Sequence, residues 1–482
     1  MPAFALPRIL LPLGIAGALS ACVAGADHPR PAVAGEAGNW VAPAAAGPVD
    51  TTWWRGLGDA ELARLVDLAV SGNRDLREAE ARLRAARADR DAAAGRALPQ
   101  LDAGGSATAN RLSRNGQLPI GNIPGFDRSF NLFDAGFDAS WEIDLWGRNA
   151  RAIDAAQARA EAAEATRRDV TMQVIAEVVA NYADLRAAQA RAASARADAD
   201  AQARIAGLTE QRYRAGESAR FDFVRADAQA RATRAALAGL DADARAAAYR
   251  LALLTGNPPE ALAGELLRPA PLPAPPPAIA AGLRSDLLRR RPDIRIAERQ
   301  LAAATADAGV AVADQFPRLT LTGSVGQQSR NADDLTSGGS TRFSIGPSLH
   351  WPIFAGGTIR AQIRAADARA DAAAAGYEKA VLGALADSET ALNRYAAAQA
   401  TRTDREAARD RTAEALDLAR QRYRAGEDDL LVLLDAQSAY SAADTAAIDA
   451  RAAELRAFVA ACKALGGGWE AFPPEGPGRQ AR

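Results

Sequence analysis

The chain has 482 residues, enough for more than one domain of ordinary size. Its formal net charge of −1 excludes the strongly basic balance typical of nucleic-acid-binding proteins, so we expect no nucleic-acid partner. The two cysteines, Cys22 and Cys462, are too few and too far apart for a disulfide framework or a cysteine metal cluster.

The N-terminus carries an export signal. Arg8 precedes an apolar run from Ile9 to Leu19, which has the length of a signal-peptide core and is too short for a retained transmembrane helix. The run ends in Leu19-Ser20-Ala21-Cys22, and small residues before a cysteine resemble the bacterial lipobox. We expect a lipoprotein signal peptide over residues 1–21 and a covalent lipid on Cys22. An ordinary signal peptide with an incidental cysteine is the alternative.

The rest of the chain is a duplication. The heptapeptide Gln-Arg-Tyr-Arg-Ala-Gly-Glu occurs at Gln211–Glu217 and again, 210 residues later, at Gln421–Glu427. Arg74–Glu80 matches Pro292–Glu298 at an offset of 218. Because the offset has fallen to 210 at the heptapeptide, the first copy contains a longer loop between these two motifs than the second copy does. The predicted organisation is a lipidated tether and equatorial segment over residues 22–58, a first repeat over 59–268, a Pro-rich linker over 269–285, a second repeat over 286–465 and a C-terminal tail over 466–482.

Apolar periodicity predicts three helices in each repeat. In the first helix, Leu76 and Leu83 continue a heptad-like apolar seam, and Pro99 stops it. Gly216 and Gly426 follow the long second helices, as expected for helix ends. The predicted helices cover about 59–98, 148–213 and 221–254 in the first repeat, and 292–314, 358–423 and 430–465 in the second.

A period of two between the first and second helix of each repeat predicts strands. Apolar or small residues alternate with polar ones, as where Asp134, Asp138 and Glu142 are interleaved with Phe133, Ala135, Phe137, Ala139, Trp141 and Ile143. We expect four strands in two hairpins within 100–143 and 318–351, with loops near 111–129 and 329–341.

The strands restrict the architecture. A bilayer tolerates β structure only as a closed barrel, and the smallest such barrels have about eight strands. Four strands in an exported chain therefore require oligomerisation, and three chains would supply twelve. The polar faces would then line a lumen made acidic by Asp134, Asp138 and Glu142. Two soluble hairpins packed on helices are the alternative.

The Ala-rich helices have apolar seams too narrow for a thick core, but they can pack side by side as coiled coils. The predicted fold class is an α+β membrane protein with an internal twofold repeat. In an oligomer, the long coiled-coil-like helices would form an α-helical tube that continues the strand barrel into the periplasm.

A series of motifs follows in order along the chain. They are Leu19 to Cys22, Trp53-Trp54-Arg55, Trp141-Glu142-Ile143-Asp144-Leu145-Trp146-Gly147-Arg148, Arg291-Pro292-Asp293, Phe316-Pro317-Arg318-Leu319, Trp351-Pro352-Ile353-Phe354-Ala355-Gly356-Gly357 and both Tyr-Arg-Ala-Gly turns. In the order and doubling of these motifs, the chain resembles the outer-membrane factor family, the TolC-like channels, and specifically the lipoprotein branch that serves tripartite efflux pumps. The resemblance covers nearly all of the mature chain.

The resemblance implies a homotrimer that is lipid-anchored in the outer membrane, spans it and extends into the periplasm. Four strands of each chain would contribute to a trimeric, twelve-stranded outer-membrane β-barrel, and the long coiled-coil-like helices would form a periplasmic α-barrel. It implies a passive exit duct for small molecules, which an inner-membrane pump of the RND or a similar type delivers through a periplasmic adaptor. The two turns would be the tips where the adaptor docks, through Tyr213, Arg214, Gly216, Tyr423, Arg424 and Gly426.

The resemblance also places the periplasmic gate just after the second turn. Leu431 and Asp435 are spaced i, i+4 on one helix face, so threefold symmetry would give an apolar ring and a carboxylate ring. The first repeat has Arg225 where the second has Asp435, so the two tips differ. A solvated or salt-bridged helix residue is the alternative for Asp435.

We expect no catalytic residue, no metal site and no cofactor beyond the lipid on Cys22, because no phosphate-binding loop, metal spacing or nucleophile motif occurs. The alternatives are the outer-membrane component of type I protein secretion or of metal export, and a coiled-coil scaffold lipoprotein without a pore. An enzyme is the least favoured class, and the sequence does not name the exported substrate.

Overall fold

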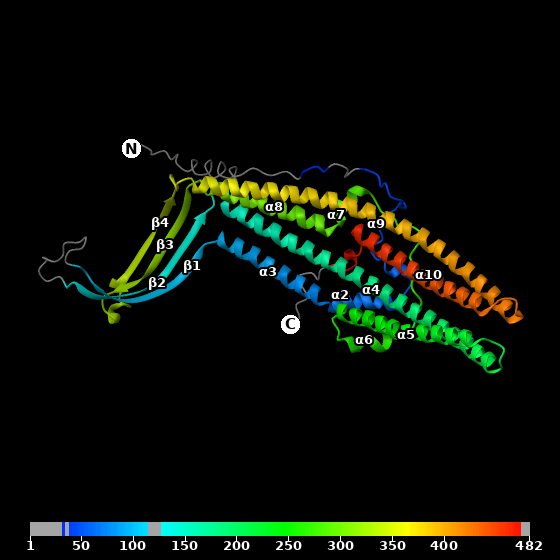
Figure 1. The fold of residues 1–482 in the computed structure, drawn as a ribbon. Helices are drawn as coiled ribbons and strands as arrows, with labels where there is room; N and C mark the ends of the chain where they lie inside the picture. The colour runs from blue at the N-terminus through cyan, green and yellow to red at the C-terminus, as the bar shows by residue number, and fades with distance from the viewer. Residues whose placement is uncertain (1–30, 34–37, 114–126, 474–482) are drawn as a thin grey trace. The chain divides into compact units, whose positions relative to one another are not determined.

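The computed structural model describes residues 31–33, 38–113 and 127–473, which form two compact units (Figure 1). The described part of the first unit is mainly residues 84–162 and 297–376, and that of the second is 32–83, 163–296 and 377–473. Cys22 lies outside the described residues, so its lipidation stays a prediction. No helix in the described ranges combines the length and the apolar character needed to cross a membrane.

The two repeats contain the same succession of long helices. The first has α2 (Ala60–Gly72), α3 (Arg74–Arg96), α4 (Arg148–Arg214), α5 (Arg220–Leu254) and α6 (Pro259–Leu266). The second has α7 (Leu287–Arg290), α8 (Pro292–Ala313), α9 (Thr358–Ala425) and α10 (Leu430–Ala464).

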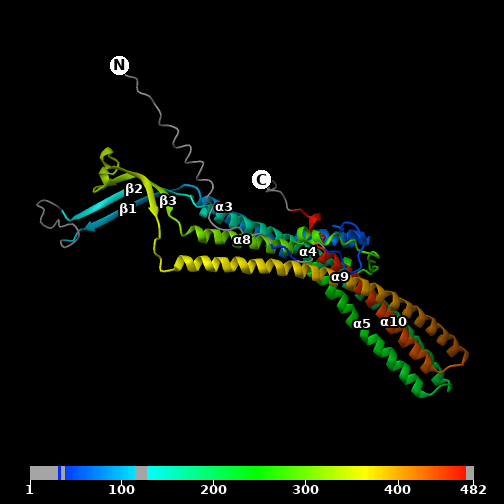
Figure 2. The same cartoon turned by 90° about the horizontal axis from the view of Figure 1, so that it is seen from above.

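The first unit contains the sheet, to which each repeat gives one hairpin (Figure 2). Its strands are antiparallel in the order β1 (Gln100–Arg111), β2 (Ser129–Ile143), β3 (Arg318–Ser329) and β4 (Thr341–His350). The four predicted strands are therefore present. The central β2–β3 pair joins the two repeats, and β1 and β4 are edges without a described neighbour on their outer side.

The register sorts the side chains onto two faces. Even-numbered residues pair with even-numbered ones across all three ladders, as in Asp102 opposite Asp138 and Asp138 opposite Ser324. The odd-numbered face is apolar and largely exposed in the single chain; its large side chains are Leu101, Phe137, Trp141, Leu321, Val325, Phe343, Ile345 and Leu349. The described residues of the chain therefore leave the apolar face of the sheet largely open.

Equivalent tryptophans fix the strand ends. The Trp141 indole donates to the carbonyl of Ala97 at 3.0 Å, and the Trp351 indole donates to the carbonyl of Gln315 at 3.1 Å. Each bond ties the last part of a hairpin to the end of the helix that precedes it. The two repeats therefore share an equivalent tryptophan-to-carbonyl hydrogen bond.

The core of the second unit explains the Trp53-Trp54 pair. Both indoles are buried, at 5.7 Å from each other and nearly perpendicular. Trp53 also meets the Phe458 ring edge-on at 5.8 Å, and Trp54 stacks on Phe472 at 5.9 Å. Such aromatic contacts stabilise a core beyond the area they bury, and here they join the N-terminal segment to α10 and the C-terminal region.

The prediction of one helix over 59–98 is wrong in one respect, because the helix breaks at Asn73. The Asn73 side-chain oxygen accepts from the backbone N–H groups of Asp75 and Leu76 at 2.8 and 3.1 Å, which caps α3. Asn73 also has extended backbone angles. The apolar seam continues across this break, so periodicity alone did not reveal it.

The helix α6 was not predicted. The preceding helix ends at Leu254, and after Asn257-Pro258 the residue Pro259 begins α6 at the first helical position, where its missing N–H costs nothing. The buried side chains of Leu262 and Leu266 hold this short helix in place.

An N-terminal strap, defined as residues 39–50, lies along the linker between the repeats. Ala45 donates its N–H to the carbonyl of Ile279 at 2.8 Å, and Trp40 donates its indole N–H to the carbonyl of Gly282 at 2.8 Å. The carboxylate of Glu389 on α9 accepts from the N–H groups of Val41 and Ala42 at 3.0 and 2.8 Å. The strap therefore contacts both the linker and the second repeat.

Candidate functional site

The α4–α5 and α9–α10 hairpins each end in the duplicated turn, and the two turns have the same backbone. Gly216 and Gly426 both adopt φ 76°, the left-handed conformation that glycine accepts without steric cost. The N–H of Glu217 donates to the carbonyl of Arg212 at 2.8 Å, and that of Glu427 donates to the carbonyl of Arg422 at 3.0 Å. These bonds close both helices in the same way.

The surroundings of the two turns differ. Tyr423 is only 8% exposed, within an apolar cluster that includes Ala206, Ala226, Leu416, Leu430, Leu433 and Leu434. The guanidinium of Arg212 lies 5.1 Å from the centre of the Tyr423 ring. Tyr213 is 39% exposed and stacks on Phe223 at 6.1 Å. Of the predicted docking residues, the first turn therefore presents its tyrosine and the second does not.

The helices that leave the turns also start differently. Asp429 caps α10, because its carboxylate accepts from the N–H groups of Leu431 and Val432 at 3.0 and 3.2 Å. Ala219, at the equivalent place before α5, has no side chain that can do this. Arg422 further supports the second turn through a 2.9 Å ion pair with Asp428.

The candidate gate residues share one face of α10. Leu431 and Asp435 are both exposed in the single chain and lie one helical turn apart, whereas Leu433 and Leu434 are buried. Arg225 is also exposed at the equivalent position of α5. The geometry fits a ring of leucines next to a ring of carboxylates, but the rings require further copies of the chain.

A polar junction lies beside the gate residues. Asp198 on α4 accepts from the Gln437 amide at 2.8 Å and from the Ser441 hydroxyl at 3.0 Å, both on α10. Arg420 on α9 donates to the Gln437 side-chain oxygen at 2.9 Å. Three helices are therefore held together by one buried amide.

The candidate lumen residues Asp134, Asp138 and Glu142 lie on the even-numbered face of β2. Asp134 is not a free charge, because Arg342 on β4 donates to its two carboxylate oxygens at 2.8 and 2.6 Å and Gln328 donates at 2.8 Å. The partner of Asp134 could not be predicted from the sequence, since Arg342 is 208 residues away. Within the described residues, no cluster of three or more His, Cys, Asp or Glu side chains is arranged to hold a metal ion.

Comparison with known proteins identifies this arrangement. The family model described as outer membrane efflux protein matches residues 65–257 and 283–467, that is, both repeats. The chain belongs to this family.

Individual relatives agree with this assignment. The chain is 34% identical over 421 residues to the pyoverdine export outer membrane protein OpmQ of Pseudomonas aeruginosa, covering 87% of each. It is 35% identical over 476 residues to the outer membrane protein OprJ of the same species, covering 97% of each. The solved structure of the outer-membrane channel OprN matches with a TM-score of 0.85 and 39% identity, over 93% of this chain and all of that one.

This outer membrane efflux protein is therefore a TolC-like exit duct of the outer membrane with a periplasmic extension. Its family consists of channels rather than enzymes. The predicted fold class, with its four strands, long helices and internal repeat, is confirmed.

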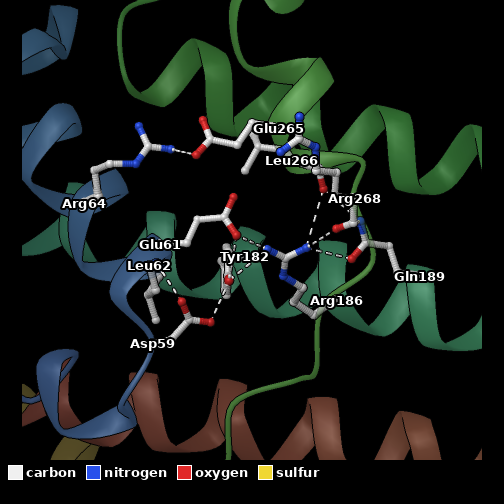
Figure 3. A network of polar contacts seen from close by, with 10 residues as sticks. All are labelled: Asp59, Glu61, Leu62, Arg64, Tyr182, Arg186, Gln189, Glu265, Leu266 and Arg268. Atoms are coloured by element: carbon white, nitrogen blue, oxygen red, sulfur yellow. Dashed lines mark hydrogen bonds and ion pairs between the residues drawn. The ribbon is translucent and has the colours of Figure 1, made fainter.

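The second unit of this efflux protein contains a buried polar network that was not predicted from the sequence (Figure 3). Arg186 on α4 is fully buried and donates to Glu61 on α2, to the Tyr182 hydroxyl at 2.9 Å and to the carbonyl of Arg268 at 2.9 Å. Gln189 donates to the carbonyl of Leu266 at 2.8 Å. The network thus fixes α2 and the end of α6 on α4.

Tyr182 belongs to the same network. Its hydroxyl donates to Asp59 at 2.6 Å, and Asp59 also caps α2 by accepting from the N–H of Leu62 at 3.0 Å. Burial, followed by the hydrogen bond to Asp59, raises the pKa of Tyr182. The tyrosine therefore stays a neutral donor. Its spacing on the apolar stripe of α4 gave no sign of a polar role.

Proposed function

We propose that three copies of the chain form a passive duct that receives small molecules from an inner-membrane pump, of the RND or a similar type, through a periplasmic adaptor. The observation that carries this proposal is the sheet of the first unit. It has four strands, two edges without a described neighbour and an exposed apolar face.

Edge strands expose unpaired N–H and C=O groups, which are costly in hydrocarbon. Pairing the β4 edge of one copy with the β1 edge of the next would satisfy them. Two copies would supply eight strands and three would supply twelve. The family relationship supports the larger number.

The closed sheet would direct its apolar face to lipid and its polar face to the lumen. Asp138 and Glu142, together with Asp102 opposite Asp138, would make that lumen acidic. Asp134 would contribute less charge, because Arg342 neutralises it.

In the second unit, Leu431 and Asp435 would form the closing rings of the duct. The lipid on Cys22 would attach the N-terminus to the outer membrane, and no other cofactor is part of the proposal. Passive transport needs only a pathway and a gate, so the pump and not the duct would select the cargo. The name of OpmQ, pyoverdine export outer membrane protein, supports small organic molecules as the cargo class.

The test is the mass of the detergent-purified mature protein together with its single-channel conductance in a planar bilayer. A trimer with a small, mostly closed conductance is the expected result. A monomer or dimer that never conducts would contradict the duct and favour a scaffold.

A further inference from the structure

The contact between the two repeats of one chain shows how two copies of the chain would meet. We define the inner seam as this contact, made by the β2–β3 ladder, by α4 with α8 and by α4 with α10. The outer seam is the contact between copies in which the β4 edge of one meets the β1 edge of the next. Such head-to-tail contacts between identical chains repeat until a ring closes. If the repeats are equivalent, a contact of the inner seam predicts one of the outer seam.

The two hairpins have the same register, which establishes that equivalence for the sheet. β3 follows β1 at the offset of 218, and β4 follows β2 at the offset of 210, as do the repeated motifs on either side of the strands. Gln100 lies opposite Ser140 in the first hairpin. Their counterparts at these offsets, Arg318 and His350, lie opposite each other in the second. The offsets can therefore be applied to the ladder that joins the hairpins.

The β2–β3 ladder then predicts a ladder between copies. Asp138 lies opposite Ser324 in the inner seam, and the counterparts of these two residues are Ser348 on β4 and Ser106 on β1. Odd-numbered residues again meet odd-numbered ones, so the apolar face would continue from one copy to the next. Their predicted pairs within the strands are Phe343–Arg111, Ile345–Ala109, Pro347–Ala107 and Leu349–Gly105.

An ion pair of the first unit has a counterpart with the same charges. Arg159 on α4 donates to Asp307 on α8 across the inner seam. The equivalent residues are Arg369 on α9 and Asp89 on α3, and both are exposed. Arg369 lines a groove with Asp307 and Asp314 of its own chain. Within the described ranges, however, neither Arg369 nor Asp89 has an ion-pair partner.

A hydrogen bond of the second unit has a counterpart with opposite charges. The Ser194 hydroxyl on α4 donates to the Asp444 carboxylate on α10 across the inner seam. The equivalent residues are Asp404 on α9 and Arg234 on α5, again both exposed. Neither forms an ion pair with any residue that the structure describes. Both residue types differ from those of the inner seam, yet the two positions remain complementary.

The outer seam keeps only part of the inner one. Trp146 stacks on Phe316 at 4.7 Å across the inner seam, whereas the equivalent positions hold Gly356 and Leu98. Leu98 is 62% exposed in the single chain. The contact between copies is therefore expected to be weaker than the contact between repeats.

We propose that the outer seam has the register in which Ser348 of one copy lies opposite Ser106 of the next, with ion pairs Arg369–Asp89 and Asp404–Arg234 between their helices. The partner on both sheet edges is thus a second copy of this chain. The proposal rests on the proposed function, because it takes an oligomeric duct, and it adds the residues that meet. A ladder shifted by two residues is the competing arrangement, since it keeps both faces of the sheet but separates these pairs.

The first experiment tests the register with cysteines in the full-length lipoprotein, oxidised in its membrane. Residues directly opposite each other have Cα atoms about 4.5–5.5 Å apart, within reach of a disulfide, whereas diagonal neighbours are about 7–8 Å apart. The test variant is Ser348→Cys with Ser106→Cys. The controls combine Ser348→Cys with Gly104→Cys or with Thr108→Cys. Cys462 is buried in the parent chain.

We expect the test variant to give covalent dimers and trimers on non-reducing gels, and the controls less than about a tenth as much. Stronger linking in either control would overturn the register. No linking in any of the three, in a protein that remains a trimer, would overturn it as well. A product linked to a different protein would overturn the assignment of the partner.

The second experiment reverses charges. Asp89→Arg or Arg369→Asp alone would place like charges together at every outer seam. We expect about a two- to fivefold larger dissociated fraction of the trimer in detergent, the size of effect that exposed ion pairs allow. The double variant should return to the parent value. Asp89→Arg combined with reversal of another exposed arginine of α9, Arg364→Asp, should not. Equal dissociation of the two double variants would contradict the pairing.

Mass and conductance of the unmodified protein separate this proposal from the function on which it rests. If that protein is a conducting trimer but the cysteines link in a shifted register, the proposed seam fails and the duct stands. If it is a monomer that never conducts, the proposed function fails together with the seam.

Discussion

The side-chain amide of Asn73 donates to the carbonyl of Leu254 at 2.9 Å, and this bond joins the start of α3 to the end of α5. The second repeat has the same joint. Arg291, offset by 218 residues from Asn73, donates to the carbonyl of Ala464 at 3.1 Å, which is offset by 210 from Leu254. In each repeat, a side chain just before the helix that leads into the sheet (α3 or α8) therefore binds the last carbonyl of the helix that follows the turn (α5 or α10).

The first of these joints requires two glycines. A methyl group on Gly256 would lie 2.1 Å from the carbonyl oxygen of Gly72, and Gly256 also has φ 73°. We expect Gly256→Ala to destabilise the protein by about 2–4 kcal/mol through overpacking and backbone strain. The measurement is the thermal unfolding midpoint of the purified protein by circular dichroism.

Gly264→Ala is the matched control for this change. Gly264 lies in the nearby helix α6 with nothing within 4 Å of an added methyl group. There we expect no loss of stability, because alanine is the better helix former. Equal midpoints for the two variants would show that the close approach at Gly256 is not required.

Removal of the buried guanidinium of Arg186 should be far more costly than removal of a surface one. Arg186→Met leaves Glu61 without its partner, and we expect a loss of about 3–5 kcal/mol. Arg196→Met breaks an ion pair with Asp241 whose side chains are about half exposed, and should cost less than about 1 kcal/mol. Thermal unfolding midpoints compare the two.

The double variant Arg186→Met, Glu61→Leu tests the cause of that loss. If the unpaired carboxylate is responsible, removing it should recover part of the stability lost in Arg186→Met. A double variant less stable than either single one would instead point to lost packing or to the bonds with the carbonyls near α6.

Asp169 should make stability depend on pH. Burial raises its pKa above the ordinary 3.8, and the charge of Asp293 raises it further, against opposing effects of Gln173, Lys463 and Arg291. The folded chain therefore holds this proton more tightly than the unfolded chain. Stability from this group is present below the unfolded pKa and is lost as the pH rises through the folded one.

We expect Asp169→Asn to unfold at a higher temperature than the parent at pH 7.5, with a smaller difference at pH 4. The control is Asp243→Asn, an exposed aspartate of α5, which should leave the midpoint unchanged at both pH values. A parent protein and an Asp169→Asn variant with parallel pH profiles would contradict the assignment of the effect to Asp169.

The gate prediction concerns Asp435. Asp435→Ala would remove the carboxylate ring and widen the constriction, so we expect higher leakage through the closed channel and a smaller preference for cations over anions. Bilayer conductance and the reversal potential in a salt gradient measure both. Arg225→Ala, at the equivalent position of the first tip, should change neither. Unchanged values in Asp435→Ala would remove Asp435 from the gate.

The architecture was largely predictable because two local signals were repeated. Alternation marked the strands and the apolar seams marked the helices, and each signal occurred again about 210 residues later. The break at Asn73 was visible only as a Gly-Asn pair within an uninterrupted seam, and α6 begins at Pro259, with only four residues between it and the end of α5 at Leu254. In both cases the new element starts where the sequence shows only the end of the previous one.

The site was less predictable, because its properties depend on distant partners. Tyr213 and Tyr423 have identical neighbours for two residues before and four after, yet one is exposed and the other buried. The difference comes from four helices that meet around Tyr423. Likewise, the sequence predicts a free charge in the lumen at Asp134, whereas the register of the sheet places Arg342 beside it.

The strap has a consequence for the order in which the chain matures. Val41 and the carboxylate of Glu389 that receives its N–H are separated by 348 residues. In a chain synthesised and exported from its N-terminus, the strap can pair with the linker as soon as Ile279 and Gly282 have followed, but the N–H groups of Val41 and Ala42 must wait for Glu389. A product terminated before residue 389 would leave these two groups without that acceptor. The strap is thus completed in two steps, and the second step requires more than half of the second repeat.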